Sequence, residues 1–168
     1  MPYRVDREGR GGFTLVEIMI ALAILGIVVV IAASNFQGMM EKYRVEGETK
    51  QMFADLMDAR GRAMQRNRTF FVQITDNAYS TYEDTSPAPD GNGILESTDA
   101  VAASATVRHT INPGGLSNFR FNRNGIASAT GTIWFTSNAQ PDYDCITVRE
   151  TRIKMGQYNA TGNTCVEK

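Results

Sequence analysis

The apolar segment from residue 13 to residue 36 constrains this chain more than any other part of it. Its 24 residues, FTLVEIMIALAILGIVVVIAASNF, carry one charged side chain, Glu17. At about 1.5 Å per residue, a helix of this length spans roughly 36 Å, enough to cross a hydrocarbon layer of about 30 Å. We therefore expect residues 13–36 to form a membrane-spanning helix.

The residues before this segment indicate its orientation. Arg4, Arg7 and Arg10 precede it, and positive charges tend to stay on the cytoplasmic side, so we expect the remainder of the chain to be exported. A secretory signal has a shorter apolar core with a small-residue cleavage site after it, whereas here a Gly-Gly pair at residues 11–12 precedes the core. A cut at this pair would keep the helix attached to the exported part.

Composition excludes several classes of protein. The 168 residues are 42% hydrophobic, which allows one ordinary globular domain in addition to the apolar segment. The 17 basic and 18 acidic side chains, with an acidic excess after residue 68, argue against nucleic acid as the main partner. One His and two Cys are too few for a structural zinc site, and we expect no cofactor.

The helical pattern continues beyond the apolar segment, over residues 37–68. Apolar side chains recur there at spacings of three and four with charged residues between them, which predicts an amphipathic continuation of one helix from Phe13 to about Arg66. The basic residues near its end admit two interpretations, a nucleic-acid patch or cations favoured by the helix dipole, and we prefer the second. They are Arg60, Arg62, Arg66 and Arg68, with Lys50 further back.

After residue 68 the pattern changes to short segments rich in aromatic and β-branched residues, separated by turns that contain Asn, Asp, Gly and Pro. Consecutive strands with such short connections form antiparallel sheet. We expect an α+β fold, in which a long N-terminal helix packs on a C-terminal antiparallel β-sheet domain of residues 69–168. The predicted strands are Thr69–Ile74, Ala78–Glu83, Thr106–Ile111, Asn118–Phe121, Thr132–Thr136 and Cys145–Ile153.

The junction Gly12-Phe13-Thr14-Leu15-Val16-Glu17 resembles the processing site of type IV prepilins and type II secretion pseudopilins. The resemblance implies that prepilin peptidase removes residues 1–12 as a leader and methylates the new N-terminus at Phe13. It also implies that Glu17 pairs with the terminal amine of a neighbouring subunit during assembly. The alternative is a plain signal anchor with a flexible Gly-Gly hinge, in which Glu17 reaches the cytoplasmic interface.

The C-terminal half is similar to the minor subunits of the GspH/FimT type. The similarity rests on DGNGILESTDAV, FRFNRNGIASATGTIWF and ITVRETRIKMG. It implies a non-enzymatic filament subunit, anchored in the inner membrane with a periplasmic domain, that assembles with other major and minor pilins or pseudopilins in the tip or initiation complex. Its further partners would be the prepilin peptidase, the inner-membrane assembly platform and membrane lipid. Two features depart from the pattern: Ser34 stands near the place where many major pilins have a helix-breaking Pro, and the tail from Tyr158 differs.

Few residues are candidates for chemistry. Cys145 and Cys165 of an exported domain predict a disulfide, with two free thiols as the alternative. Asp90, Asn92 and Glu96 resemble part of a calcium loop, but the match to an EF-hand is poor and favours a solvated loop. We interpret His109 as a structural or surface residue, and we prefer a core position for Trp134 over a role as a ligand platform.

A second hypothesis is a DNA-capturing subunit of a competence pilus. Arg149, Arg152 and Lys154 are its candidate phosphate contacts, but acidic residues stand close to them in the sequence, at Asp142, Asp144 and Glu150. A third hypothesis is an anchored enzyme. We do not favour it, because the sequence shows no recognisable set of catalytic residues.

Overall fold

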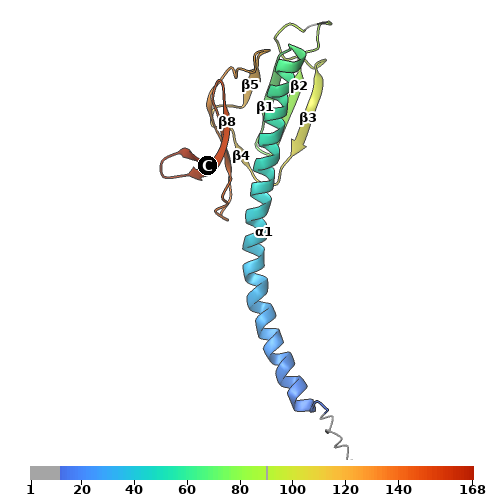
Figure 1. Ribbon diagram of the computed structural model, residues 1–168, viewed down its shortest axis with the longest axis vertical. Coiled ribbons are helices and arrows are strands. Elements are labelled where there is room, and N and C mark those ends of the chain that lie inside the picture. Colours follow the sequence, from blue (N-terminus) through green and yellow to red (C-terminus); the bar gives the residue numbers. More distant parts are fainter. Residues whose placement is uncertain (1–11, 90) are drawn as a thin grey trace, which may run out of the picture. The chain divides into compact units, whose positions relative to one another are not determined.

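The computed structural model describes residues 12–89 and 91–168, and its first element is helix α1, Leu15–Arg66 (Figure 1). The chain divides into two compact units, residues 1–38 and residues 39–168, and α1 contributes to both. The end of α1 agrees with the prediction, and its start lies two residues later than expected.

In the first unit, α1 is apolar around its whole circumference. Every large apolar side chain from Leu15 to Ile31 is more than half exposed in the subunit. Within the described part of the chain, α1 is the one helix whose length and composition would allow it to cross a membrane. Such a surface is stable in lipid or against other helices, but not in water.

In the second unit, α1 buries one face. Five of its side chains are almost completely buried, at spacings that place them on a single stripe: Val45, Met52, Leu56, Ala59 and Ala63. Charged residues occupy most of the remaining circumference. This one-sided burial is what docks a surface helix on a domain.

The strands form two antiparallel sheets rather than one. The first has the order β3-β2-β1-β5, and the second has the order β4-β6-β7-β8-β9. The strands of the first sheet are β1 Phe70–Ile74, β2 Ala78–Glu83, β3 Ala100–Thr106 and β5 Asn118–Phe121. Those of the second are β4 Ile111–Asn112, β6 Gly131–Phe135, β7 Cys145–Val148, β8 Ile153–Asn159 and β9 Thr164–Glu167.

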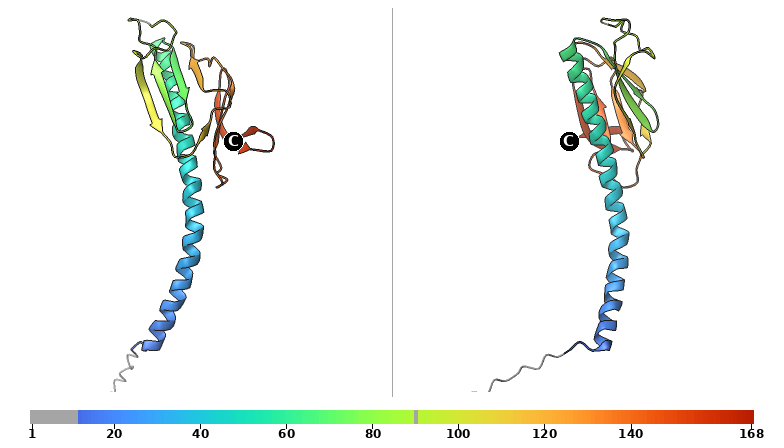
Figure 2. Two further views of the ribbon diagram at one scale, coloured as in Figure 1. Left: turned by 180° about the vertical axis from the view of Figure 1, so that it is seen from behind. Right: turned by 90° about the vertical axis from the view of Figure 1, so that its right-hand side faces the viewer.

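A single hydrophobic core joins the buried stripe of α1 to both sheets. Alternate residues of the strands point into it, as the two-residue period of a strand requires. The largest contributors from the strands are Phe70, Tyr79, Phe121, Ile133, Phe135 and Ile146. The second half of α1 can be followed against the strands in two further views (Figure 2).

Two of the predicted strands were placed wrongly, and strands β3 and β9 were not predicted. Thr106–Ile111 is not a strand, because β3 ends at Thr106, β4 begins at Ile111, and the chain bends between them. Strand β3 is rich in Ala and Ser, so its composition carries little β signal. The predicted strand Cys145–Ile153 divides into β7 and β8 at a turn in which the N–H of Arg149 donates to the carbonyl of Arg152.

Gly156 in β8 offers a test of how closely the second sheet is packed. A Cβ atom on Gly156 would lie 2.1 Å from the carbonyl oxygen of Val166 and 3.0 Å from the sulfur of Cys165. We expect Gly156→Ala to reduce the free energy of unfolding by about 1–3 kcal/mol, because backbone must move to admit the methyl group. Thermal unfolding of the detergent-solubilised protein measures the effect.

The matched control is Gly47→Ala, since a Cβ atom on Gly47 would meet nothing within 4 Å. We expect this variant to be as stable as the parent protein or slightly more stable, because Ala favours helix. Equal stability of the Gly156→Ala variant and the parent would contradict the packing argument.

Candidate functional sites

The start of α1 carries the residues of the predicted processing site. Gly12 and Phe13 precede the helix, and Phe13 is 81% exposed. The expected leader, residues 1–12, lies outside the described residues except for Gly12. The described residues at the position of the predicted cut, Gly12 and Phe13, are therefore non-helical and accessible.

Glu17 has a local role that sequence analysis missed. Its backbone N–H donates to the Thr14 hydroxyl at 3.2 Å, and the N–H of Thr14 points back to the Glu17 carboxylate at 3.4 Å. This reciprocal arrangement is a capping box, which satisfies two of the backbone donors left free at a helix N-terminus. The signal was present in the sequence as Thr-x-x-Glu before an apolar run.

His109 lies in the bend between β3 and β4 and contacts two carboxylates of α1. Its Nδ1 is 2.7 Å from Glu48 and its Nε2 is 2.6 Å from Glu41. Glu48 also accepts the backbone N–H groups of Arg108 and His109. We call these three side chains, Glu41, Glu48 and His109, the histidine clamp. The structural role expected for His109 is therefore a specific one, which fixes the β3–β4 connection to the helix.

The clamp changes the acid–base behaviour of His109, whose side chain is 9% exposed. Burial by itself lowers the pKa of His109, but hydrogen bonds to Glu41 and Glu48 outweigh it and raise the pKa above its ordinary 6.5. The same contact lowers the pKa of Glu41. Both shifts favour an imidazolium ion held between two carboxylates.

A second polar contact joins α1 to the segment before β7. The nearly buried carboxylate of Glu46 accepts the N–H of Asp142 at 3.0 Å, and Lys42 pairs with the Asp142 side chain at 2.9 Å. This side-chain pairing lowers the pKa of Asp142. The helix therefore positions this loop as well as the β3–β4 connection.

Cys145 of β7 and Cys165 of β9 are joined by a disulfide. It links the final hairpin, β8 and β9, to the middle of the second sheet. The expectation that Trp134 lies in the core is wrong. Its neighbours Ile133 and Phe135 point into the core, so the two-residue period of the strand places Trp134 on the opposite face. There it stacks on Tyr158, with ring centroids 4.5 Å apart.

The loop between β2 and β3 is organised by two nearly buried carboxylates. Asp84 accepts the N–H groups of Asn92 and Gly93, and Asp99 accepts those of Thr85, Ser86 and Glu96. These two aspartates were not singled out from the sequence, because isolated Asp residues in a loop carry no distinctive spacing.

The calcium candidates lie in this same loop. Asn92 donates its side-chain amide to Glu96 at 2.9 Å, and Asp90 lies outside the described residues. In residues 12–89 and 91–168, no group of three or more His, Cys, Asp or Glu side chains is arranged to hold a metal ion. The loop is held by protein hydrogen bonds.

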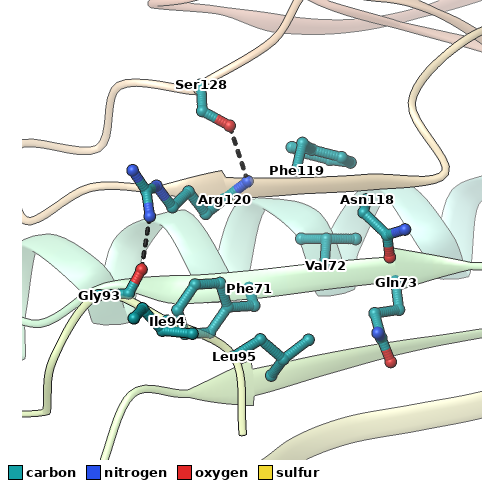
Figure 3. Close-up of a pocket in the computed structure, with 10 residues that line it drawn as sticks. All are labelled: Phe71, Val72, Gln73, Gly93, Ile94, Leu95, Asn118, Phe119, Arg120 and Ser128. Atoms are coloured by element: carbon teal, nitrogen blue, oxygen red, sulfur yellow. Dashed lines mark hydrogen bonds between the residues drawn. The ribbon is translucent and has the colours of Figure 1, made fainter.

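A groove of about 550 Å³ separates this loop from the outer face of the first sheet. Figure 3 shows Arg120 of β5 reaching across it to the carbonyl of Gly93, while the Arg120 N–H donates to Ser128. Phe71, Ile94 and Leu95 supply its apolar wall.

The basic residues near the end of α1 bind parts of their own domain. Arg66 and Arg68 both pair with Glu83, Arg62 pairs with Asp58, and Arg60 donates to the carbonyls of Gly125 and Thr151. Arg152 and Lys154, candidates for phosphate contacts, both pair with Glu167. These contacts give the cations structural roles.

Comparison with solved structures identifies the fold. The minor pseudopilin EpsH from the type 2 secretion system of Vibrio cholerae matches with a TM-score of 0.50 and 12% identity, over 68% of this chain and 97% of that one. The type IV minor pilin FimU of Pseudomonas aeruginosa matches with a TM-score of 0.51 and 16% identity, over 70% and 91%. The long helix on antiparallel sheets is therefore a pilin-like α+β fold, as expected.

Sequence families make the assignment specific. Residues 8–33 match the prokaryotic N-terminal methylation motif, and residues 48–151 match the type II transport protein GspH. The chain belongs to the GspH family and is a minor pilin or pseudopilin of a type IV pilus or a type II secretion system. A search of curated proteins found no significant match.

This assignment confirms the resemblance and the non-enzymatic class predicted from the sequence. The family implies processing by prepilin peptidase and assembly with other pilins. The apolar N-terminal helix is of the kind that anchors prepilin-type proteins in the inner membrane.

The histidine clamp predicts a pH-dependent stability. The folded protein binds the His109 proton more tightly than the unfolded chain, so the stabilisation is fully present below pH 6.5 and is lost as pH rises through the raised pKa. We expect the midpoint temperature of thermal unfolding to decrease as the pH is raised above 6.5 and through the raised pKa of His109.

The His109→Gln variant is the matched control, because it retains polar contacts without a titrating group. His109 is the single His of the chain, so the difference between the two pH profiles isolates its contribution. Identical pH profiles for the parent protein and the variant would exclude the clamp as a source of stability.

Proposed function

We propose that prepilin peptidase cuts this chain after Gly12, and that the mature subunit, beginning at a methylated Phe13, leaves the inner membrane to join a filament. In this proposal residues 13–36 are the membrane and filament-core helix, residues 37–68 continue it, and residues 69–168 form the exported domain. The subunit works in the tip or initiation complex together with other minor subunits and the assembly platform.

The observation that carries the proposal is the fully apolar, exposed surface of the first half of α1. More than a dozen large apolar side chains between Leu15 and Ile31 lie on all sides of the helix. Lipid covers such a surface in the membrane, and only neighbouring apolar helices can replace lipid when the subunit is extracted. In a filament core lined by helices, the same apolar surface stays covered and out of contact with water.

Glu17 is the one charged residue in this apolar segment, and we assign it two separate roles. A carboxylate that moves from the membrane interface into a filament core needs a cationic partner, and the terminal amine of Phe13 on a neighbouring subunit is the partner we propose. The capping box with Thr14 gives Glu17 an independent role in its own subunit.

Gly26 supports close packing between subunits. A glycine inside a helix costs about 1 kcal/mol relative to Ala, and a Cβ atom on Gly26 would meet nothing within 4 Å in the subunit. Contacts inside the subunit therefore do not require this glycine, whereas close approach of a second helix would. Ala21 and Ala23, with Ala32 and Ala33, are small residues that would extend the same kind of contact.

Substitutions at Glu17 and Thr14 separate the charge from the cap. Glu17→Gln keeps the capping box, which accepts Gln as well as Glu, and loses the charge, whereas Thr14→Ala loses the cap partner and keeps the charge. If the charge pair drives docking, we expect Glu17→Gln and Glu17→Ala to be cut after Gly12 but to be depleted from filaments at least tenfold, and Thr14→Ala to assemble.

Mass spectrometry of the membrane-bound protein measures cleavage and methylation, and immunoblotting of sheared filaments measures assembly. Retention of the leader through Gly12 in the parent protein, with prepilin peptidase present, would contradict the whole proposal. If Glu17→Gln assembles normally and Thr14→Ala does not, the capping box, and not the charge pair, is the reason that assembly requires Glu17.

A graded series at Gly26 tests the helix contact. We expect Gly26→Ala to assemble like the parent protein and Gly26→Leu to be incorporated several-fold less, because a larger side chain holds the neighbouring helix away. Unchanged unfolding of the exported domain in both variants serves as the control. Equal incorporation of Gly26→Leu and the parent would show that no helix approaches at this position.

A further inference from the structure

A groove of about 710 Å³ lies at the second sheet, and none of the residues that line it belongs to α1. Residues from β6, β8, β9 and the segment between β6 and β7 line it. Its volume is within the range of small-molecule sites in proteins. Neither the filament role proposed above nor the disulfide requires a groove at this place.

Two aromatic rings form one wall of the groove. Trp134 and Tyr158 lie with their planes 6° from parallel, and both rings line the groove. The strand register explains how they meet: Trp134 pairs with Cys145, Cys145 pairs with Gly156, and Tyr158 lies two residues beyond on the same face. Gly156, which has no side chain, lies between them in the register, and both rings are partly exposed.

Amide and hydroxyl groups form the rest of the groove. Gln157 donates its side-chain amide to the carbonyl of Pro141, and Asn159 accepts the N–H groups of Thr161 and Gly162, which holds both amides in place beside the rings. Gln140, at the rim, has a φ angle of 45°, a left-handed conformation that is uncommon outside Gly and Asn. Such strain is often found where a loop is shaped for a ligand.

The charge of the groove distinguishes between classes of ligand. Its lining residues, all of which are described, include one carboxylate, Asp144, and no Lys or Arg. A single-stranded nucleic acid would stack on aromatic rings, but such sites combine the rings with a positively charged groove. A lining of ring faces, amides and hydroxyls without cations fits a neutral ligand that has both apolar C–H faces and many hydroxyl groups.

We propose that this groove binds a neutral glycan, a chain of pyranose sugars. The C–H face of one sugar ring stacks on the aromatic pair, and its hydroxyl groups exchange hydrogen bonds with Asn159, Gln140 and Thr161. An exported filament subunit meets such chains in the cell wall and at the cell surface. The glycan site is independent of how the subunit assembles.

The single Trp of the chain, Trp134, makes the binding measurable. We titrate the detergent-solubilised full-length protein with chitohexaose, an acetamido sugar chain of the cell-wall type, and separately with maltohexaose, and follow Trp134 fluorescence. A saturable change with chitohexaose alone supports a site for cell-wall glycan, and one with both sugars supports a general pyranose site. No saturable change with either sugar at millimolar concentration would overturn the proposal.

Variants separate ligand binding from a purely structural role of the aromatic pair. We expect Tyr158→Phe to bind like the parent, and Tyr158→Leu and Gln140→Gly each to weaken binding at least threefold. Gln140→Gly removes the rim amide without straining the backbone, and Ser104→Ala, on the first sheet, is the matched control. Thermal unfolding verifies that each variant is folded.

Two results would refute the assignment. If Tyr158→Leu and Gln140→Gly both fold and bind the sugar as the parent does, the fluorescence change comes from elsewhere. If a thymidine oligonucleotide, but neither sugar, changes the fluorescence in a salt-dependent manner, the groove is a nucleic-acid site.

Discussion

The buried stripe of α1 is the contact on which the unit of residues 39–168 depends. No described strand belongs to both sheets, so hydrogen bonding within a sheet cannot hold one sheet to the other. Met52, Leu56 and their neighbours on α1 instead share a single apolar core with residues from both. Burial of each large side chain contributes about 1.5–3 kcal/mol, which makes this core the main source of cohesion. Glu46 and the histidine clamp then fix where individual loops meet the helix.

One helix thus serves two environments. Its first half, apart from Glu17, exposes apolar side chains on every side and suits lipid or other helices, whereas its second half buries one apolar stripe against the sheets. The change occurs without a break in the helix, since α1 runs from Leu15 to Arg66. Under the proposed assembly, the exchange of lipid for neighbouring helices would leave the domain folded, because the two surfaces are made by different residues.

Much of the fold was predictable because its signals are local. The apolar segment, the amphipathic continuation and strands such as Ala78–Glu83 follow from the period and type of consecutive residues. Strand β3 was not predicted because the Ala and Ser residues of AVAASAT have little intrinsic preference for strands. The segment is a strand because the fold places it beside β2, with which it pairs. The strand predicted around His109 failed because Glu48, on α1, accepts the backbone N–H groups that a strand would have used.

The sequence by itself determined the long helix, the prepilin motif from Gly12 to Glu17 and the class of protein, because each depends on residues close together in the chain. Only the tertiary structure decided which distant side chains meet. His109 contacts Glu48 and Glu41 from 61 and 68 positions away, and Trp134 of β6 reaches Tyr158 of β8 across β7. No periodicity encodes such pairs, since their distance is set by sheet order and register.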